Sequence, residues 1–280
     1  MSPSLALQMK TGNEFAFVAL NEDKPMIASR GASRFLPVLG TLIMLFASVG
    51  WAAAQVNTNS QTDIEKRIKA SATVLDEIMG VKDKAIPDKI MDSAKCVAVV
   101  PDMVRIAIGF GGEHGHGVVT CRTAHGWSAP APFSITGGSW GLQIGGEGVD
   151  LVMLVMHKRG MDALLSSKFK IGGNISGAAG PIGREAGAST DIKMTSEILS
   201  YSRAKGIFAG IDLSGAKVSQ DRDETHVLYG KMIPFATILN GKVAPPQGSE
   251  PFLAAVRKYS TQAREQGSVN TAETTTTAQK

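Results

Sequence analysis

Residues 109–122 read GFGGEHGHGVVTCR, a cluster of glycines that leads into a stretch typical of a β-strand. Five of the first nine residues are glycine and two are histidine, so the cluster could hold a phosphate, bind a metal or let the chain reverse. A phosphate loop needs a helix directly after its glycines, because the helix N-terminus faces the anion. The strand-like residues on both sides instead favour a β-hairpin in which glycine supplies the turn.

The two histidines of the cluster, His114 and His116, are two residues apart. In an extended segment both imidazoles would face the same side of the strand. Such a pair can supply two ligands to a metal ion, with a third ligand from Glu113, His125 or elsewhere. Nothing in the sequence fixes that third ligand, so we interpret the histidines as exposed turn residues and predict neither a metal nor a cofactor.

Outward from the cluster, the chain is apolar, rich in β-branched residues and repeatedly interrupted by glycine or proline. Helices are predicted over residues 63–79, after Pro87, near residues 161–169 and close to the C-terminus. Strands are predicted between them without a regular βαβ alternation, and glycines within strands indicate close backbone approach or sharp bends. We therefore predict an α+β fold: a mainly antiparallel, glycine-rich coiled sheet or partial barrel, with flanking helices at both ends. The predicted strands are CVAVV, RIAIGF, GVVTCR, GLQIG, VDLVMLVM, FKIGGNIS, DIKMTSEILSYS and GIFAGIDLSG, the last two joined by a turn at residues 203–206.

The first 54 residues have the order of a secretory signal. Arg30 and Arg34 precede an apolar run, FLPVLGTLIMLFASVGW, which three alanines follow. The pattern predicts cleavage between Ala54 and Gln55 and a periplasmic or secreted location, with an uncleaved N-terminal anchor as the alternative. The expected organisation is a targeting segment (1–54), a short linker (55–62), one domain (63–243), a C-terminal helix (244–262) and a disordered tail (263–280).

The charged residues and the cysteines bear on the possible ligands of the protein and on its compartment. The net charge is +4 and the basic residues are scattered, with no aromatic-interleaved patch, so nucleic-acid binding is not predicted. The two cysteines, Cys96 and Cys121, fall in separate predicted strands. An oxidising compartment would permit a disulfide between them. Two buried free thiols are the alternative interpretation.

The segment GGSWG at residues 137–141 matches the G-x-S-x-G pattern of a hydrolase nucleophile elbow, with Ser139 as the nucleophile. Asp191 or Asp212, followed by His226, would complete the triad in the hydrolase chain order. The elbow requires a strand-to-helix turn, whereas the residues after Ser139 look like a strand interrupted by glycines. No enzyme is therefore predicted, and a serine hydrolase is kept only as a third possible function.

Taken in order, several motifs of the chain resemble those of the SYLF domain family, also called the yeast actin-binding or lipid-binding SYLF family. The resemblance covers residues 63–243, and the order and spacing of the motifs make it specific. The motifs are AKCVAVVP (94–101), the glycine cluster leading to GVVTCR (117–122), WSAP (127–130), G-x-S-x-G-x-Q-x-G (137–145), GAAGPIGR (177–184) and YSRAKGIFAGIDLSG (201–215).

The resemblance implies a non-enzymatic lipid-binding module. In eukaryotic members an N-terminal amphipathic helix engages phosphoinositide-bearing membranes, and some members bind actin filaments; residues 63–79 match that helix. Basic side chains near an anionic surface could meet lipid phosphates, while apolar ones could insert shallowly. The alternative is that the apolar stripe packs on the sheet as core. The expected lipid-binding residues are Lys66, Arg67, Lys69, Ile64, Ile68 and Leu75, with Arg203 and Lys205 in the later turn.

Together with the targeting segment, the resemblance predicts a bacterial envelope protein that recognises anionic phospholipid head groups through the basic helix on a rigid β scaffold. A secreted bacterial protein would not meet actin, although actin binding is known in the family. The expected partner is therefore an anionic lipid or membrane surface, or another envelope protein. A structural or protein–protein interaction module is the alternative function.

Overall fold

The computed structural model describes residues 60–81, 86–173, 175–183 and 195–278. The predicted targeting segment, its cleavage site and most of the predicted linker lie outside this part of the chain. The described elements are, in order, the helix over residues 60–79, α2 (Asp88–Ser93), β1 (Cys96–Thr123), β2 (Gly126–Trp127), β3 (Ala131–Val155), α3 (Lys158–Leu165), β4 (Lys168–Lys170), β5 (Gly177–Ala179), β6 (Ile198–Ala204), β7 (Ile207–Gly210), β8 (Lys217–Gln220), α5 (Arg222–Tyr229), α6 (Phe235–Leu239) and α7 (Glu250–Ala278).

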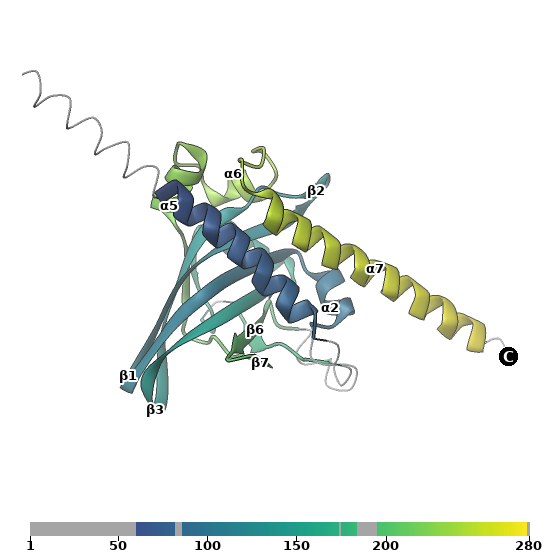
Figure 1. Ribbon diagram of the computed structural model, residues 1–280. Helices are drawn as coiled ribbons and strands as arrows, with labels where there is room; N and C mark the ends of the chain where they lie inside the picture. Colours follow the sequence, from purple (N-terminus) through teal and green to yellow (C-terminus); the bar gives the residue numbers. More distant parts are fainter. Residues whose placement is uncertain (1–59, 82–85, 174, 184–194, 279–280) are drawn as a thin grey trace, which may run out of the picture. The chain divides into compact units, whose positions relative to one another are not determined.

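Two very long strands, β1 and β3, form the frame of the sheet (Figure 1). They pair antiparallel from Cys96↔Val155 to Val119↔Ala131, with two shifts of register along the way. The ribbon curls so strongly that the two ends of β1 meet, and the backbone N–H of Arg122 donates to the carbonyl of Lys95 at 2.7 Å. The segments predicted as separate strands are thus the two halves of single curved strands.

Shorter strands extend this frame into a half-barrel. β6 pairs with the second half of β3, and β5 and β7 flank β6. β8 pairs with the first half of β3 and carries β4 at the edge. All of these pairs are antiparallel except β5–β6, so the sheet is mixed but mainly antiparallel. The predicted α+β fold, with a coiled sheet and helices at both ends, is confirmed (Figure 1).

Each face of the sheet has its own hydrophobic core, because successive side chains of a strand point to opposite faces. Val97 and Val99 belong to a first core that includes the helix over residues 60–79, α2 and α7. Ala98 and Val100 belong to a second core on the other face, which α3 and α6 join. Both cores consist of residues between Ile64 and Ala263, so the chain from Gln55 onward contains the whole described fold.

The glycine cluster does not form the predicted hairpin turn. Residues 109–117 lie inside β1, and the chain reverses between β1 and β3, around residues 124–130. The glycines serve close packing instead, because a Cβ atom on Gly117 would lie 2.3 Å from the carbonyl oxygen of Val99. On Gly115 it would lie 2.6 Å from a methyl group of Val100. The interpretation of strand glycines as points of close backbone approach is confirmed.

The C-terminal helix is longer than predicted. The sequence suggested a helix over residues 244–262 and a disordered tail from residue 263, but α7 runs from Glu250 to Ala278. After Pro251 the helix contains no proline, which is the residue that most strongly ends a helix. A single interior glycine, Gly267, costs about 1 kcal/mol relative to alanine and does not by itself end a helix.

Candidate functional site

The apolar stripe of the helix over residues 60–79 is part of the core. Ile64, Ile68 and Leu75 are all buried in the first core, as are Ile78 and other residues of the same stripe. This corrects the expectation that these side chains insert into a membrane, because they already pack against the sheet and α7. The alternative left open by the sequence, a stripe that packs as ordinary core, is the one observed.

The basic residues of the same helix fall into two groups. Arg67 is half-buried and forms an ion pair with Glu224 of α5, so it ties two helices together. Lys66 is 73% exposed and lies 3.5 Å from Asp63. Lys69 is exposed and has no ion pair within the described part of the chain. Of the three predicted phosphate contacts on this helix, only the two lysines therefore present their charge to solvent.

The two basic residues of the later turn differ in the same way. Arg203 donates to Asp150 of β3 at 3.0 Å and also pairs with Glu77, so it holds β6 against β3 and the helix over residues 60–79. Lys205 is 84% exposed and lies 3.6 Å from Glu147. Its positive φ of 48°, followed by a φ of 77° at Gly206, confirms the predicted turn between β6 and β7.

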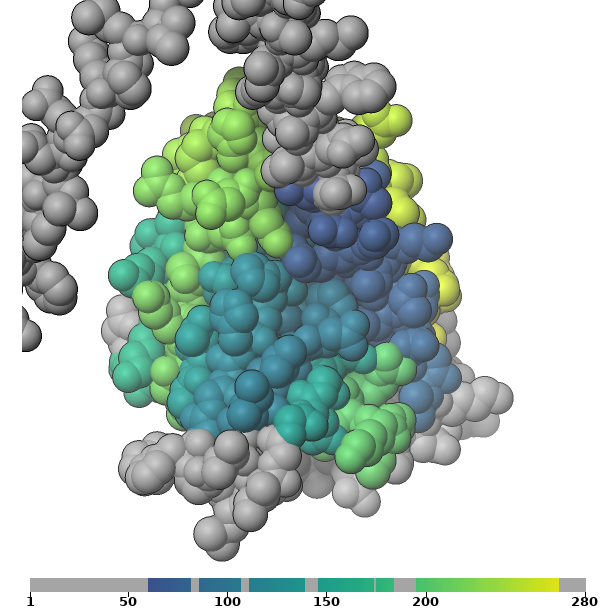
Figure 2. All heavy atoms as spheres, turned by 60° about the vertical axis from the view of Figure 1, so that its left-hand side comes forward, coloured from purple at the N-terminus to yellow at the C-terminus, as the bar shows by residue number. Residues whose placement is uncertain are grey.

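Between the helix over residues 60–79 and β1 lies a groove of about 460 Å³. Figure 2 shows that the two elements are neighbours on this face of the molecule. Lys66 and Arg67 line it from the helix, and Val104, His114 and His116 line it from β1. The groove brings the predicted helix residues and the glycine cluster together. The histidines are thus strand residues beside a groove, and the prediction that they lie in a turn is wrong.

Hydrogen bonds connect the two histidines to each other and to α5. Nε2 of His114 lies 3.1 Å from Nε2 of His116, whose Nδ1 lies 2.8 Å from Oδ2 of Asp221. Asp221 is the N-cap of α5 and accepts a hydrogen bond from the backbone N–H of Glu224 at 2.9 Å. The D-x-x-E spacing of these two acidic residues is that of a capping box, a signal from which this helix could have been predicted.

His116, Asp221 and Glu224 place one potential metal ligand each within 4.8 Å of one another. The guanidinium group of Arg67, however, already binds the Glu224 carboxylate. A metal ion bound at this place would be repelled by the positive charge of Arg67. The ligands considered from sequence do not converge either, because Glu113 is buried and paired with Arg105 at 3.0 Å, and His125 lies in the reversal after β1.

Arg67 also favours the charged form of the Glu224 carboxyl group. Burial raises the pKa of the Glu224 carboxyl above its ordinary range, and the hydrogen bond and charge of Arg67 oppose that rise. A carboxylate in such a place depends on its cation, since an unpaired buried charge is strongly destabilising.

We therefore expect Arg67→Met to lower the free energy of unfolding by about 2 kcal/mol near neutral pH, less than for a fully buried pair because both side chains keep some solvent contact. Without Arg67 the folded-state pKa of Glu224 rises further above the unfolded value. The stability loss is then largest above that folded pKa and shrinks as the pH falls through it. Urea unfolding at neutral and acidic pH measures both effects.

The matched control is Arg257→Met, which breaks an exposed ion pair with Glu250 and is expected to change stability by less than about 0.5 kcal/mol. Equal losses of unfolding free energy in the two variants would show that the Arg67–Glu224 pair contributes no more than an exposed ion pair.

Ser139 does not lie at a nucleophile elbow. It lies within β3, opposite Gly111 of β1, and the chain continues as a strand to Val155. The strand-to-helix turn that the elbow requires is therefore replaced by a strand pair, and the interpretation of GGSWG as a nucleophile elbow is wrong. Of the two aspartates considered for the triad, Asp191 is outside the described residues. Asp212 accepts hydrogen bonds from the backbone N–H and the hydroxyl group of Ser214.

The two cysteines are joined in a disulfide. Cys96 and Cys121 have an S–S distance of 2.11 Å and are separated by 25 residues in sequence. Both lie in β1, one near each end, and both are buried in the second core. The disulfide therefore closes the curl of this strand.

Comparison with known proteins agrees with the family resemblance of the motifs. The Ysc84 family, described as "Las17-binding protein actin regulator", matches residues 136–259. LAS seventeen-binding protein 3 of Saccharomyces cerevisiae is 32% identical over 200 residues, which are 69% of this chain and 42% of that protein. Protein YSC84 of the same yeast is 29% identical over 208 residues, 71% of this chain and 44% of the relative.

A mammalian relative extends the comparison. The SH3 domain-containing YSC84-like protein 1 of Rattus norvegicus is 27% identical over 211 residues, which are 73% of this chain and 62% of that protein. The chain thus spans less than half the length of the two yeast relatives. The first of these relatives is named for a binding partner and the rat protein for its SH3 domain, and none of the three is named as an enzyme. The shared region and the ordered motifs identify the chain as a member of the SYLF-domain (Ysc84) family.

Proposed function

We propose that this protein catalyses no reaction and binds an anionic membrane surface through exposed lysines of the helix over residues 60–79. The observation that carries the proposal is the division of this helix into two faces. Its apolar face is locked in the core, whereas Lys66 and Lys69 lie exposed on the outside. Such lysines can approach lipid phosphates without any unfolding of the protein.

Exposed apolar side chains of β1, one of them in the same groove as Lys66, support a membrane contact. Val104 and Ile106 of β1 are 49% and 54% exposed, and Val104 lines the same groove as Lys66. Their partners across the ladder are Gly148 and Gly146, which have no side chains to cover them. In this proposal Val104 and Ile106 make the shallow apolar contact with the membrane that the sequence analysis expected from Ile64, Ile68 and Leu75.

For location we propose the bacterial envelope. The buried disulfide between Cys96 and Cys121 supports a compartment that is oxidising. The order of charges, apolar run and alanines in residues 1–54 supports export. Separately, none of the helices in the described ranges is both long and apolar enough to cross a membrane.

The proposal predicts that Lys66→Ala combined with Lys69→Ala weakens binding to anionic vesicles roughly 30-fold, since each lysine near such a surface contributes about 1 kcal/mol. Co-sedimentation of the protein beginning at Gln55 measures the effect. The vesicles are phosphatidylcholine alone and an equal mixture of phosphatidylcholine and phosphatidylglycerol. Binding to the mixture is expected to fall as salt is added.

A matched control replaces Lys158 of α3 and Lys242, which follows α6. Both are exposed lysines attached to helices of the second core. Binding to the mixed vesicles should be nearly unchanged in this variant. If wild-type protein binds neutral and mixed vesicles equally, the electrostatic account is refuted.

The names of the relatives favour a second candidate function, binding of another protein. The family description and the yeast relative both refer to a binding partner, Las17 or LAS seventeen. In this case the Lys66→Ala and Lys69→Ala variant would stay where the wild-type protein is found in the cell. A defined partner would also co-purify equally well with both forms.

A further inference from the structure

Two rows of polar side chains cross four neighbouring strands, β4, β8, β3 and β1, on one side of the sheet. Within each row the residues lie directly opposite one another in the strand pairing. We call the six residues that define this surface the lysine face. The first row consists of Lys170, Lys217, Thr136 and His114, and the second begins with Lys168 and Ser219.

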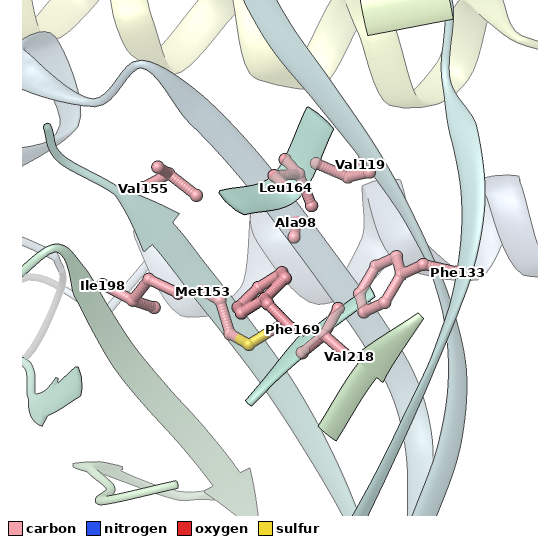
Figure 3. Close-up of a pocket in the computed structure, with 9 residues that line it drawn as sticks. All are labelled: Ala98, Val119, Phe133, Met153, Val155, Leu164, Phe169, Ile198 and Val218. Carbon is pink, nitrogen blue, oxygen red and sulfur yellow. The ribbon is translucent and has the colours of Figure 1, made fainter. Parts of the chain in front are cut away.

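The lysine face points away from the second core because its residues alternate with core residues. Phe169 lies between the two lysines of β4, and Val218 precedes Ser219 in β8. Both are buried and line a small apolar cavity of about 10 Å³ with Phe133 (Figure 3). Since successive side chains of a strand face opposite sides, the packing of these apolar residues fixes the lysines on the outer surface.

Among the described residues, none balances the charge of the three lysines on this face. Lys168, Lys170 and Lys217 are exposed, and none has an ion pair to a residue within the described ranges. Neither row contains a carboxylate. Lys170 and Lys217 lie directly opposite each other, an arrangement of like charges that is destabilising in a sheet. An anion bound between the strands would remove that repulsion.

From these observations we infer that the lysine face is a second contact surface for the phosphate groups of an anionic membrane, which rests on the proposed function. The rows cross four strands, a width of roughly 14 Å at the usual strand spacing. The three lysines lie on the neighbouring strands β4 and β8 at the edge of the sheet and are all exposed, so the phosphates of a flat membrane surface can reach them. Thr136 and Ser219 add hydroxyl groups that can donate to phosphate oxygens.

The lysine face also adjoins the surface already proposed. His114, at the end of the first row, hydrogen-bonds to Thr136 at 3.1 Å and lines the groove together with Lys66. Lipid phosphates can therefore meet one continuous surface, from the helix over residues 60–79 across β1 and β3 to the edge formed by β8 and β4.

The test compares three triple variants of the protein beginning at Gln55 on the two kinds of vesicle described above. Replacing Lys168, Lys170 and Lys217 by alanine is expected to weaken binding to the mixed vesicles on the order of 100-fold. Replacing the same three by arginine, which keeps the charge, should leave binding within a few-fold of wild type. Replacing Lys158, Lys231 and Lys242 by alanine removes equal charge elsewhere and should have little effect.

The outcomes separate this inference from the proposed function. If wild-type protein binds the mixed vesicles and the first alanine variant binds as well as wild type, the lysine face is not a membrane contact, while the proposed function stands. If wild-type protein does not prefer anionic vesicles, the proposed function fails and the inference fails with it. Unchanged vesicle binding together with lost binding to polyglutamate would assign the face to an acidic protein partner and overturn the membrane assignment.

Discussion

Gly117→Ala is expected to lower the free energy of unfolding by about 3 kcal/mol, the upper end of the range for overpacking substitutions. The added Cβ would lie 2.3 Å from the carbonyl oxygen of Val99 and 2.9 Å from the ring of Phe133. The first of these is a backbone atom of the other half of β1, so no flexible side chain can move aside. The two halves of the strand would have to separate, which would open the curl of the sheet.

The matched control for this prediction is Gly112→Ala in the same strand. A Cβ there would have only the carbonyl oxygen of Gly137 near it, at 3.9 Å. Because alanine loses less conformational freedom than glycine on folding, this variant should be as stable as wild type or slightly more stable. Chemical denaturation of both variants measures the contrast. Similar losses of unfolding free energy at the two positions would mean that any glycine of β1 is needed for stability, and that the close contact with Val99 is not the cause.

Loss of the disulfide has a comparably large expected effect. A covalent link between residues separated by 25 positions restricts the unfolded chain by about 3.5 kcal/mol in the chain-entropy description. Here the link also joins the two ends of the curved strand β1. We therefore expect the reduced protein to unfold at a clearly lower denaturant concentration than the oxidised protein.

A variant with both Cys96→Ala and Cys121→Ala provides the control. Its stability should be close to that of the reduced wild-type protein, less the contribution of the two lost sulfur atoms to the second core. Adding reductant must not change its unfolding curve. A wild-type protein whose unfolding curve is the same with and without reductant would contradict the predicted stabilisation.

Much of the architecture could be predicted from local patterns. The apolar spacing of residues 63–79 predicts a helix, which the structure has over residues 60–79, and α2 follows Pro87 as expected. The closely spaced β-branched segments predict a mainly antiparallel coiled sheet. The ordered motifs predict the family. These features depend on the periodicity of neighbouring residues, which the sequence displays directly.

The candidate site was predicted less completely. Lys66, Lys69 and Lys205 are exposed as a contact with lipid requires, but Arg67 and Arg203 are engaged in ion pairs with distant acidic residues. The lysine face was missed, although the alternation of lysine with apolar residues in β4 is visible in the sequence. What the sequence does not display is that β4 and β8 are neighbours, because they are separated by a long stretch of chain.

By itself, the sequence determined the helix, the class of the sheet and the possibility of a disulfide. Only the tertiary structure decided whether the helix offers its apolar stripe to a membrane or to the core, and whether the glycine cluster turns the chain or packs it. An amphipathic helix has the same pattern in both settings, and a glycine permits both a turn and a close approach. Which of them occurs depends on the surface that the rest of the chain places opposite: β1 and β3 for the helix, and Val99 for Gly117.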